Sequence, residues 1–352
     1  MEMNDVRLTS YSHGAGCGCK ISPGVLNEIL SGSYAITGGD KLLVGNHSKD
    51  DAAVYDIGNG NCLISTTDFF MPIVDDAFDF GRIASANAIS DVYAMGGTPI
   101  LAIAILGWPI AKLEPSVAKR VIDGARSVCA EAGIQLAGGH SIDSPEPIFG
   151  LAVNGIVTKT NIKRNDTGRE GNLLYLTKSV GVGILTTAEK KGLLLDEDKG
   201  IATSQMIRLN DLGATLGNME EVHALTDVTG FGVLGHLLEM AKGSKLGAVL
   251  NAGKISLICT NIVHYIKAGC IPGGSDRNWK SYGKDIIMNE KESGSEIRTI
   301  LCDPQTSGGL LISIAPEGAG KLEKLLIEKG MEKYATPIGQ LVKEHPGMIQ
   351  IS

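Results

Sequence analysis

The stretch "NCLISTTDFFMPIVDDAFDFGRIASANAISDVYAMGG", residues 61–97, decides the fold. Residues 61–70 predict a buried strand with a carboxylate near its end. Residues 79–97 have apolar side chains at helical spacing and stop at a Gly pair, which is a common end of a helix. The sequence therefore predicts a strand that leads into a helix.

The pattern of strands and helices continues on both sides of this unit. Its predicted elements are strands at 98–106, 134–141 and 148–158, an amphipathic helix at 115–133, and, beyond a polar segment, a strand and turn at 173–183, a helix at 202–217, a strand end with a helix at 223–241, late strands at 308–316 and 335–342, and a surface loop at 280–296. The two halves resemble each other, and each has a carboxylate where a strand gives way to a helix. We therefore expect an α+β fold of two similar mixed α/β domains.

Domain bounds follow from changes in composition. Residues 1–47 are rich in Gly and Ser and predict a flexible N-terminal arm. Residues 48–158 and 173–352 are the expected N-terminal and C-terminal domains, and the polar segment 159–172 is the expected linker.

Composition excludes several classes of protein. Apolar residues make up 43% and charged residues 20% of the chain, with a net charge of −7, which disfavours binding to nucleic acids and to anionic membranes. The seven cysteines are odd in number and mostly far apart, so a secreted disulfide framework is not expected. The apolar run 100–108 is shorter than the ~20 residues of a membrane helix, and the polar opening does not resemble a signal peptide. We expect a cytoplasmic location.

Four aspartates stand in unusual settings. P-loop, zinc-protease and α/β-hydrolase motifs are absent from the sequence. Asp51, Asp68, Asp91 and Asp227 each lie beside Gly or small residues, and Asn87 lies four residues before Asp91 on one helical face. A single such Asp more often caps a helix or forms a turn. Four of them favour a site where Mg²⁺ bridges protein to polyphosphate.

The arm carries the segment "HGAGCGCKIS", residues 13–22. A thiol near Lys20 has its thiolate favoured by the positive charge, so Cys17 or Cys19 is a candidate nucleophile or carrier of a soft atom. Lys20 itself could neutralise phosphate charge. The alternative is a zinc site that includes His13, but a structural site needs a fourth ligand and none is near.

Two glycine-rich segments are candidates for backbone contact with an anion. "AGGHS", residues 137–141, predicts a turn whose N–H groups could hold a nucleotide, although a plain tight turn is the simpler interpretation. "DPQTSGGLLIS", residues 303–313, is similarly rich in turn residues before a strand, and a structural use is its default interpretation.

Together, five segments resemble the selenophosphate synthetase (selenide, water dikinase) family. They are "YSHGAGCGCKIS" (11–22), residues 66–99, "LAGGHSID" (136–143), "LTDVTGFGVLGH" (225–236) and "DPQTSGGLL" (303–311). The resemblance spans nearly the whole chain. It implies the two-domain architecture of the wider aminoimidazole ribonucleotide synthetase-like superfamily, with an ATP site that lacks a P-loop.

The family resemblance also implies an activity, in which ATP, selenide and water give selenophosphate, AMP and phosphate, supplying activated selenium for selenocysteine and selenouridine. By resemblance, Cys17 and Lys20 are catalytic, and Asp51, Asp91 and Asp227 bind Mg²⁺. The expected nucleotide contacts are Lys20, Ser48, Lys49, Asp50, Asp68, Asn87 and Asp91, with Gly139, His140 and Ser141 reaching the ATP of the other subunit of a homodimer.

Two other interpretations of the sequence stay open. One is a different ATP-using member of the superfamily, such as a small-molecule kinase, although the "GCGCK" segment argues against it. The other is a selenium- or metal-binding carrier without catalysis. Expected partners are ATP, selenide and a second copy of the chain, with a selenium-delivery protein also possible.

Overall fold

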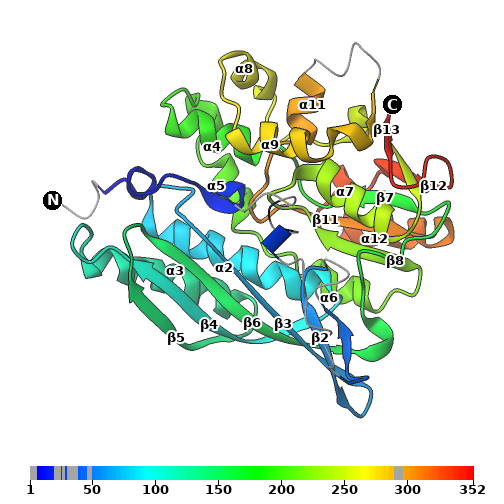
Figure 1. Cartoon of the computed structure of the whole chain (residues 1–352), viewed down its shortest axis with the longest axis horizontal. Helices are drawn as coiled ribbons and strands as arrows, with labels where there is room; N and C mark the ends of the chain where they lie inside the picture. Colours follow the sequence, from blue (N-terminus) through cyan, green and yellow to red (C-terminus); the bar gives the residue numbers. More distant parts are fainter. Residues whose placement is uncertain (1–5, 20–24, 26–27, 30–38, 46–49, 289–295) are drawn as a thin grey trace.

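The computed structural model describes residues 6–19, 25, 28–29, 39–45, 50–288 and 296–352 of the chain. Two β-sheets form its framework, one in each half of the sequence (Figure 1). No helix in these described ranges is both long enough and apolar enough to span a membrane.

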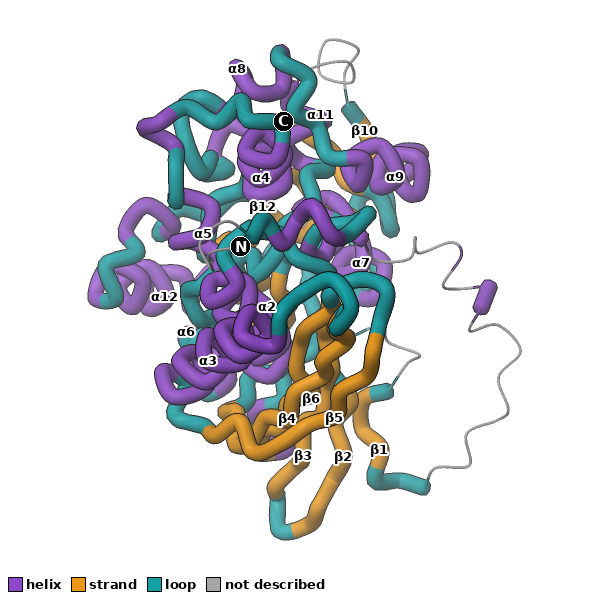
Figure 2. Tube along the Cα trace, turned by 90° about the vertical axis from the view of Figure 1, so that its left-hand side faces the viewer, coloured by secondary structure: helices purple, strands orange, loops and turns teal. Residues whose placement is uncertain are grey.

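The N-terminal half contains a six-stranded sheet with the order β1-β2-β3-β6-β4-β5. Its elements are β1 (Leu42–Val44), β2 (Ala53–Gly58), β3 (Asn61–Phe70), α2 (Ala77–Ala94), β4 (Thr98–Trp108), α3 (Pro115–Glu131), β5 (Gln135–Asp143) and β6 (Ile148–Thr158). Only the β4–β5 pair is parallel. Helices α2 and α3 lie along one face of the sheet (Figure 2). The predicted strands at 61–70 and 148–158 are confirmed with the same bounds.

Helix α2 is the central element of this half, and its sequence explains its bounds. The Asp76 side chain accepts a hydrogen bond from the backbone N–H of Asp79 and so caps the first turn. The helix ends before Gly96, whose φ of +75° favours glycine. Close packing on α3 needs glycine as well, because a Cβ on Gly81 would lie 1.9 Å from the carbonyl oxygen of Val121.

The C-terminal half contains a seven-stranded sheet with the order β10-β13-β9-β12-β7-β11-β8. Its strands are β7 (Leu173–Leu176), β8 (Val222–Asp227), β9 (Gly247–Leu250), β10 (Ile286–Ile287), β11 (Leu310–Ile314), β12 (Gly339–Val342) and β13 (Ile349–Ile351). Its helices are α4 (Val182–Lys190), α5 (Ile201–Met206), α6 (Leu212–Gly217), α7 (Gly232–Gly243), α8 (Ile262–Lys267), α9 (Gly273–Tyr282), α11 (Glu296–Leu301) and α12 (Pro316–Glu328). The mixed α/β character predicted for both halves is confirmed.

Three local predictions were wrong. The single helix predicted at 202–217 is two helices, α5 and α6, since buried Asn210 between them donates from Nδ2 to Ser90 Oγ and to the Gly308 carbonyl. The surface loop predicted at 280–296 includes the end of α9 and strand β10, which pairs with β13; residues 289–295 lie outside the described part.

The third error concerns the glycine turn predicted at 137–141. These residues continue strand β5 instead. Gly138 and Gly139 have φ values of +149° and +153°, and a Cβ on Gly139 would lie 2.2 Å from the Ala104 carbonyl oxygen. The glycines therefore let β5 run close beside β4 rather than reverse the chain.

Candidate active site

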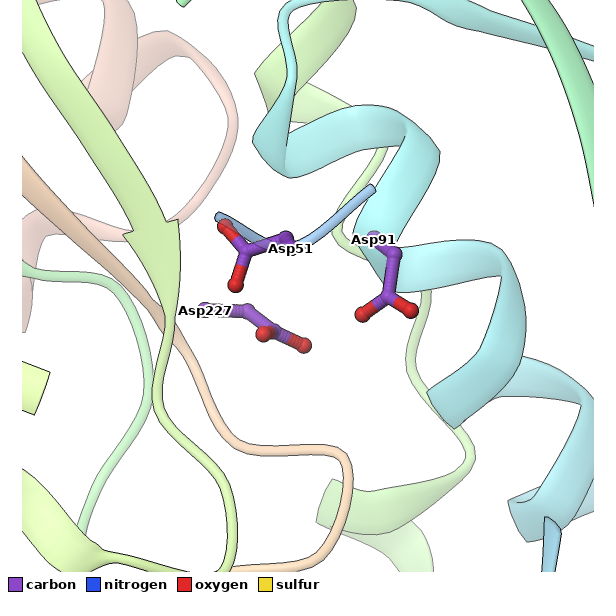
Figure 3. A group of neighbouring side chains, drawn as sticks. All are labelled: Asp51, Asp91 and Asp227. Carbon is purple, nitrogen blue, oxygen red and sulfur yellow. The ribbon is translucent and has the colours of Figure 1, made fainter. Parts of the chain in front are cut away.

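Three of the predicted aspartates meet at the boundary between the two halves. Asp51 lies just before β2, Asp91 is in the last turn of α2, and Asp227 is the last residue of β8. One oxygen from each carboxylate lies within 4.8 Å of the others. Figure 3 shows the three side chains directed toward a common space. The fold thus brings together residues separated by up to 176 positions.

Burial and mutual repulsion dominate the electrostatics of this cluster. Asp227 is 1% and Asp91 9% exposed. The pKa of Asp51 is raised well above its usual value, first by burial and then by the charges of Asp227, Asp50 and Asp91. Asp51 Oδ1 accepts a hydrogen bond from Thr226 Oγ1 at 2.9 Å, whereas its buried Oδ2 has no hydrogen-bond partner among the described residues.

This donor set fits a hard divalent cation. Mg²⁺ prefers carboxylate oxygens and would neutralise charges that otherwise repel one another. The buried Oδ2 of Asp51 offers a lone pair that the protein does not use. Among the described residues, these aspartates are the one group of three or more His, Cys, Asp or Glu side chains close enough to share an ion.

Helix α2 and strand β3 hold two parts of the site in register. Asn87 Nδ2 donates to Asp68 Oδ2 at 2.7 Å, and Thr66 Oγ1 donates to Asp91 Oδ2 at 2.6 Å. Four helical residues rise about 6 Å and two strand residues about 6.7 Å, so the two spacings nearly match. The predicted shared face of Asn87 and Asp91 thus meets one face of β3.

Cys17 completes this row of side chains. It lies in the short 3₁₀ turn Gly16–Cys19 and is 1% exposed. Its thiol donates to Asn87 Oδ1 at 3.2 Å, and its backbone N–H donates to Thr306 Oγ1 at 3.0 Å. The part of the arm that carries Cys17 is therefore packed into the site in this structure.

Asp50 has a different environment from its neighbour. Its Oδ1 accepts hydrogen bonds from the backbone N–H groups of Asn165 and Asp51, at 3.2 and 3.3 Å. Burial is the main cause that raises its pKa to about 7. Asp50 thus ties the segment before β2 to the connection between the two sheets.

Of the remaining predicted residues, those that the structure describes lie away from this cluster. Gly139, His140 and Ser141 are exposed on β5, which is the edge strand at the opposite end of the sheet from β1. Lys20, Ser48 and Lys49 lie outside the described residues, as does the side chain of Cys19. His13, from the zinc alternative, is exposed and contacts the Glu146 carboxylate at 2.9 Å.

Three further side chains shape the site and were not predicted from the sequence, namely those of Thr66, Thr226 and Thr306, and the backbone N–H of Ser307 is a fourth such group. Thr66 lies two residues before Asp68, but it bonds to Asp91 rather than to that neighbour. Thr226 directly precedes Asp227, yet it bonds to Asp51. The sequence shows that each Thr stands close to a candidate Asp. It does not show which aspartate the Thr hydroxyl bonds to.

Two family models match the chain. "AIR synthase related protein, N-terminal domain" matches residues 49–157, and "AIR synthase related protein, C-terminal domain" matches residues 169–351. Among solved structures, thiamine-monophosphate kinase from Stenotrophomonas maltophilia has a TM-score of 0.63 at 19% identity, covering 90% of this chain and 92% of its own. A structure titled "AaThiL complexed with AMPPCP and TMP" has a TM-score of 0.65 at 16% identity, with 93% and 91% coverage. At these identities the likeness concerns the fold alone, and together with the two matched domains it confirms the predicted two-domain α+β architecture.

Sequence relatives are much closer. A selenide, water dikinase of Colwellia psychrerythraea is 56% identical over 341 residues, which cover 97% of each chain. The selenide, water dikinase of Escherichia coli strain K12 is 55% identical over 351 residues, covering 100% of this chain and 99% of its own. Identity of this level over the full length, together with the two matched domains, places the chain in the selenide, water dikinase family of AIR synthase-related proteins.

Proposed function

We propose that this chain is a kinase-type enzyme that makes selenophosphate from ATP, selenide and water, with AMP and phosphate as the other products. One observation supports this proposal most directly. Cys17, Asn87 and Asp68 form a hydrogen-bonded row beside the cluster of Asp51, Asp91 and Asp227. This arrangement would put a soft nucleophile next to a site for a polyanion. A carrier that only binds selenium would not need the aspartates.

The aspartate cluster is the proposed magnesium site. Asp51, Asp91 and Asp227 would hold Mg²⁺, which supplies neutralisation of polyphosphate charge when bound. Thr226 and Thr66 orient the carboxylates of Asp51 and Asp91 through their hydroxyl groups. Fixed orientation matters because phosphoryl transfer depends mainly on positioning and electrostatics.

Cys17 is the proposed catalytic residue that presents selenium. Its position beside Asn87 places the sulfur one side chain away from Asp68, which we propose contacts the nucleotide. Lys20 follows three residues later in the sequence and is the proposed cation for the phosphates. Ser48, Lys49 and Asp50 are further proposed nucleotide contacts, with Asp50 acting through the backbone it holds.

A homodimer is the proposed assembly. The face of the six-stranded sheet opposite α2 and α3 carries exposed apolar side chains, namely Tyr55, Ile57, Phe69, Leu101, Ile103, Ile142 and Ile156. A large exposed apolar face favours burial against a partner. His140 lies on this same face through its pairing with Ile105, which supports a contact of 139–141 with the other subunit.

We also propose three further properties. They are the domain bounds 1–47, 48–158, 159–172 and 173–352, a cytoplasmic location and a selenium-delivery partner. The matched segments 49–157 and 169–351 support the division into two domains.

The decisive experiment is anaerobic incubation with ATP, Mg²⁺ and selenide, followed by phosphorus NMR. We expect a selenophosphate signal and AMP, both dependent on selenide. ADP as the end product would instead indicate a small-molecule kinase, and bound selenium without ATP consumption would indicate a carrier. Cys17→Ser with full activity would disprove the role of Cys17.

A further inference from the structure

The turn that carries Cys17 is enclosed by loops of the C-terminal half. Segment 228–231 follows β8, and segment 303–309 precedes β11. A Cβ on Gly230 would lie 2.5 Å from the Cys17 carbonyl oxygen, and a Cβ on Gly18 would touch the Pro304 ring at 3.6 Å. Residues far from Cys17 in sequence thus form the seat in which it lies.

Two consecutive residues of the 303–309 loop hold the Cys17 backbone N–H and the side chain that accepts its thiol. Thr306, which is 2% exposed, accepts the Cys17 backbone N–H at 3.0 Å. Ser307 donates its backbone N–H at 2.8 Å to Asn87 Oδ1, the atom that also accepts the Cys17 thiol. The loop therefore fixes the cysteine backbone directly and its sulfur through Asn87.

The loop is itself held firmly. The buried Lys178 ammonium donates to the Ser307 carbonyl at 2.9 Å, and Gln305 donates its backbone N–H to the Thr229 carbonyl at 3.0 Å. Gly16, at φ +51°, comes so close that a Cβ there would lie 2.5 Å from Thr306 Oγ1. Because these contacts hold the 303–309 loop in place, the loop can determine where the Gly16–Cys19 turn lies.

We propose that Thr306 is a positioning residue that seats Cys17 over the site through its hydroxyl group. Thr306 acts through Cys17, whose backbone N–H its hydroxyl accepts. The proposal rests on the proposed role of Cys17 for its effect on catalysis. Its structural part, that the hydroxyl keeps the thiol buried, can be tested without any turnover.

The test compares the alkylation of Cys17 by iodoacetamide in the full-length protein and three variants. Modification is located by fragmentation mass spectrometry, which separates Cys17 from Cys19. Thr306→Val removes the acceptor at nearly constant volume, and we expect alkylation to be about five- to tenfold faster, as one lost hydrogen bond implies. Thr306→Ser keeps a hydroxyl and should restore the slow rate. Thr187→Val is the matched control, because its hydroxyl bonds to the Gly183 carbonyl within α4.

A kinetic readout separates positioning from general damage. For Thr306→Val we expect kcat for selenophosphate to fall at least fivefold with an unchanged KM for ATP, and the Ser variant to recover it. The proposal would be overturned if Cys17 were alkylated in Thr306→Val at the wild-type rate. It would also be overturned if Thr187→Val accelerated the alkylation of Cys17 as much as Thr306→Val does. Faster alkylation in Thr306→Val, combined with full activity in Cys17→Ser, would support the positioning of Cys17 by Thr306 but reject the catalytic role of Cys17.

Discussion

The Sγ atom of Cys17 lies 3.2 Å from Oδ1 of Asn87, and the amide nitrogen of the same Asn87 lies 2.7 Å from Asp68. The Asn87 side chain is wholly buried. Its orientation is fixed because the backbone N–H of Ser307 donates to Oδ1 from a second direction. A single amide therefore joins the arm, the C-terminal loop and strand β3. Its carbonyl accepts while its NH₂ donates, so no other side chain of this size can serve all three contacts.

Asn87→Asp is the sharpest test of this arrangement. The new carboxylate keeps the shape of the amide, but it faces Asp68 at hydrogen-bond distance without a donor. We expect a loss of about 2–3 kcal/mol in the free energy of unfolding, measured by urea titration, because a buried polar contact becomes a repulsive one. Selenophosphate formation should fall at least a hundredfold.

The matched control is Asn218→Asp, since Asn218 is exposed and bonds to the Ala214 carbonyl of its own helix. Stability and activity should both stay near wild type there. An Asn87→Asp protein with wild-type stability would show that Asp68 and Asn87 do not pack as described.

Gly139→Ala tests the close approach of β5 to β4. A methyl group at this position would lie 2.2 Å from the Ala104 carbonyl oxygen. We expect a loss of about 2–3 kcal/mol in unfolding free energy from the combined clash and backbone strain. Gly138→Ala, with a similar φ of +149° but open space around it, carries the strain alone and should lose less. Equal losses in the two variants would rule out the clash as the cause.

The sequence allowed much of the N-terminal half to be predicted, because its signals are local. The apolar character of 61–70 predicts one strand, the helical spacing along 79–97 predicts one helix, and the Asn87–Asp91 spacing predicts one face of that helix. The glycine signal at 138–139 misled because glycine serves close strand approach as well as turns. Asn210 broke a predicted helix because its side chain bonds to both halves of the molecule.

The candidate site was predictable in its members but not in its connections. Asp51, Asp91 and Asp227 stood out by their neighbours in sequence, yet which oxygen faces which hydroxyl depends on how the two sheets pack. Thr306 lies 289 residues from Cys17, and nothing local distinguishes its hydroxyl from that of any other buried Thr. Contacts of this range arise only from the tertiary structure.

The proposed homodimer can be tested at its apolar face. Ile103→Glu places a charge in the middle of the exposed side of the six-stranded sheet. We expect sedimentation velocity to show a dimer for the wild type and a monomer for the variant, because an unpaired charge is costly to bury. Ile327→Glu, on an exposed position of α12, is the control and should leave the mass unchanged. A wild-type protein that sediments as a monomer at micromolar concentration would reject the dimer.

Metal removal should make the stability of the protein depend on pH. The pKa of Asp50 is raised to about 7 and that of Asp51 well above its usual value, so both bind protons more tightly in the folded state than in the unfolded chain. Stability therefore falls as the pH rises from about 4, the unfolded pKa, through about 7. In EDTA we expect the Tm to decrease across this window, and saturating Mg²⁺ to reverse the decrease because it neutralises the cluster. Asp51→Asn should flatten the EDTA profile and weaken the Mg²⁺ effect. A Tm in EDTA that rises from pH 5 to 7, or an Asp51→Asn protein with the full Mg²⁺ response, would contradict the assignment of this cluster as the metal site.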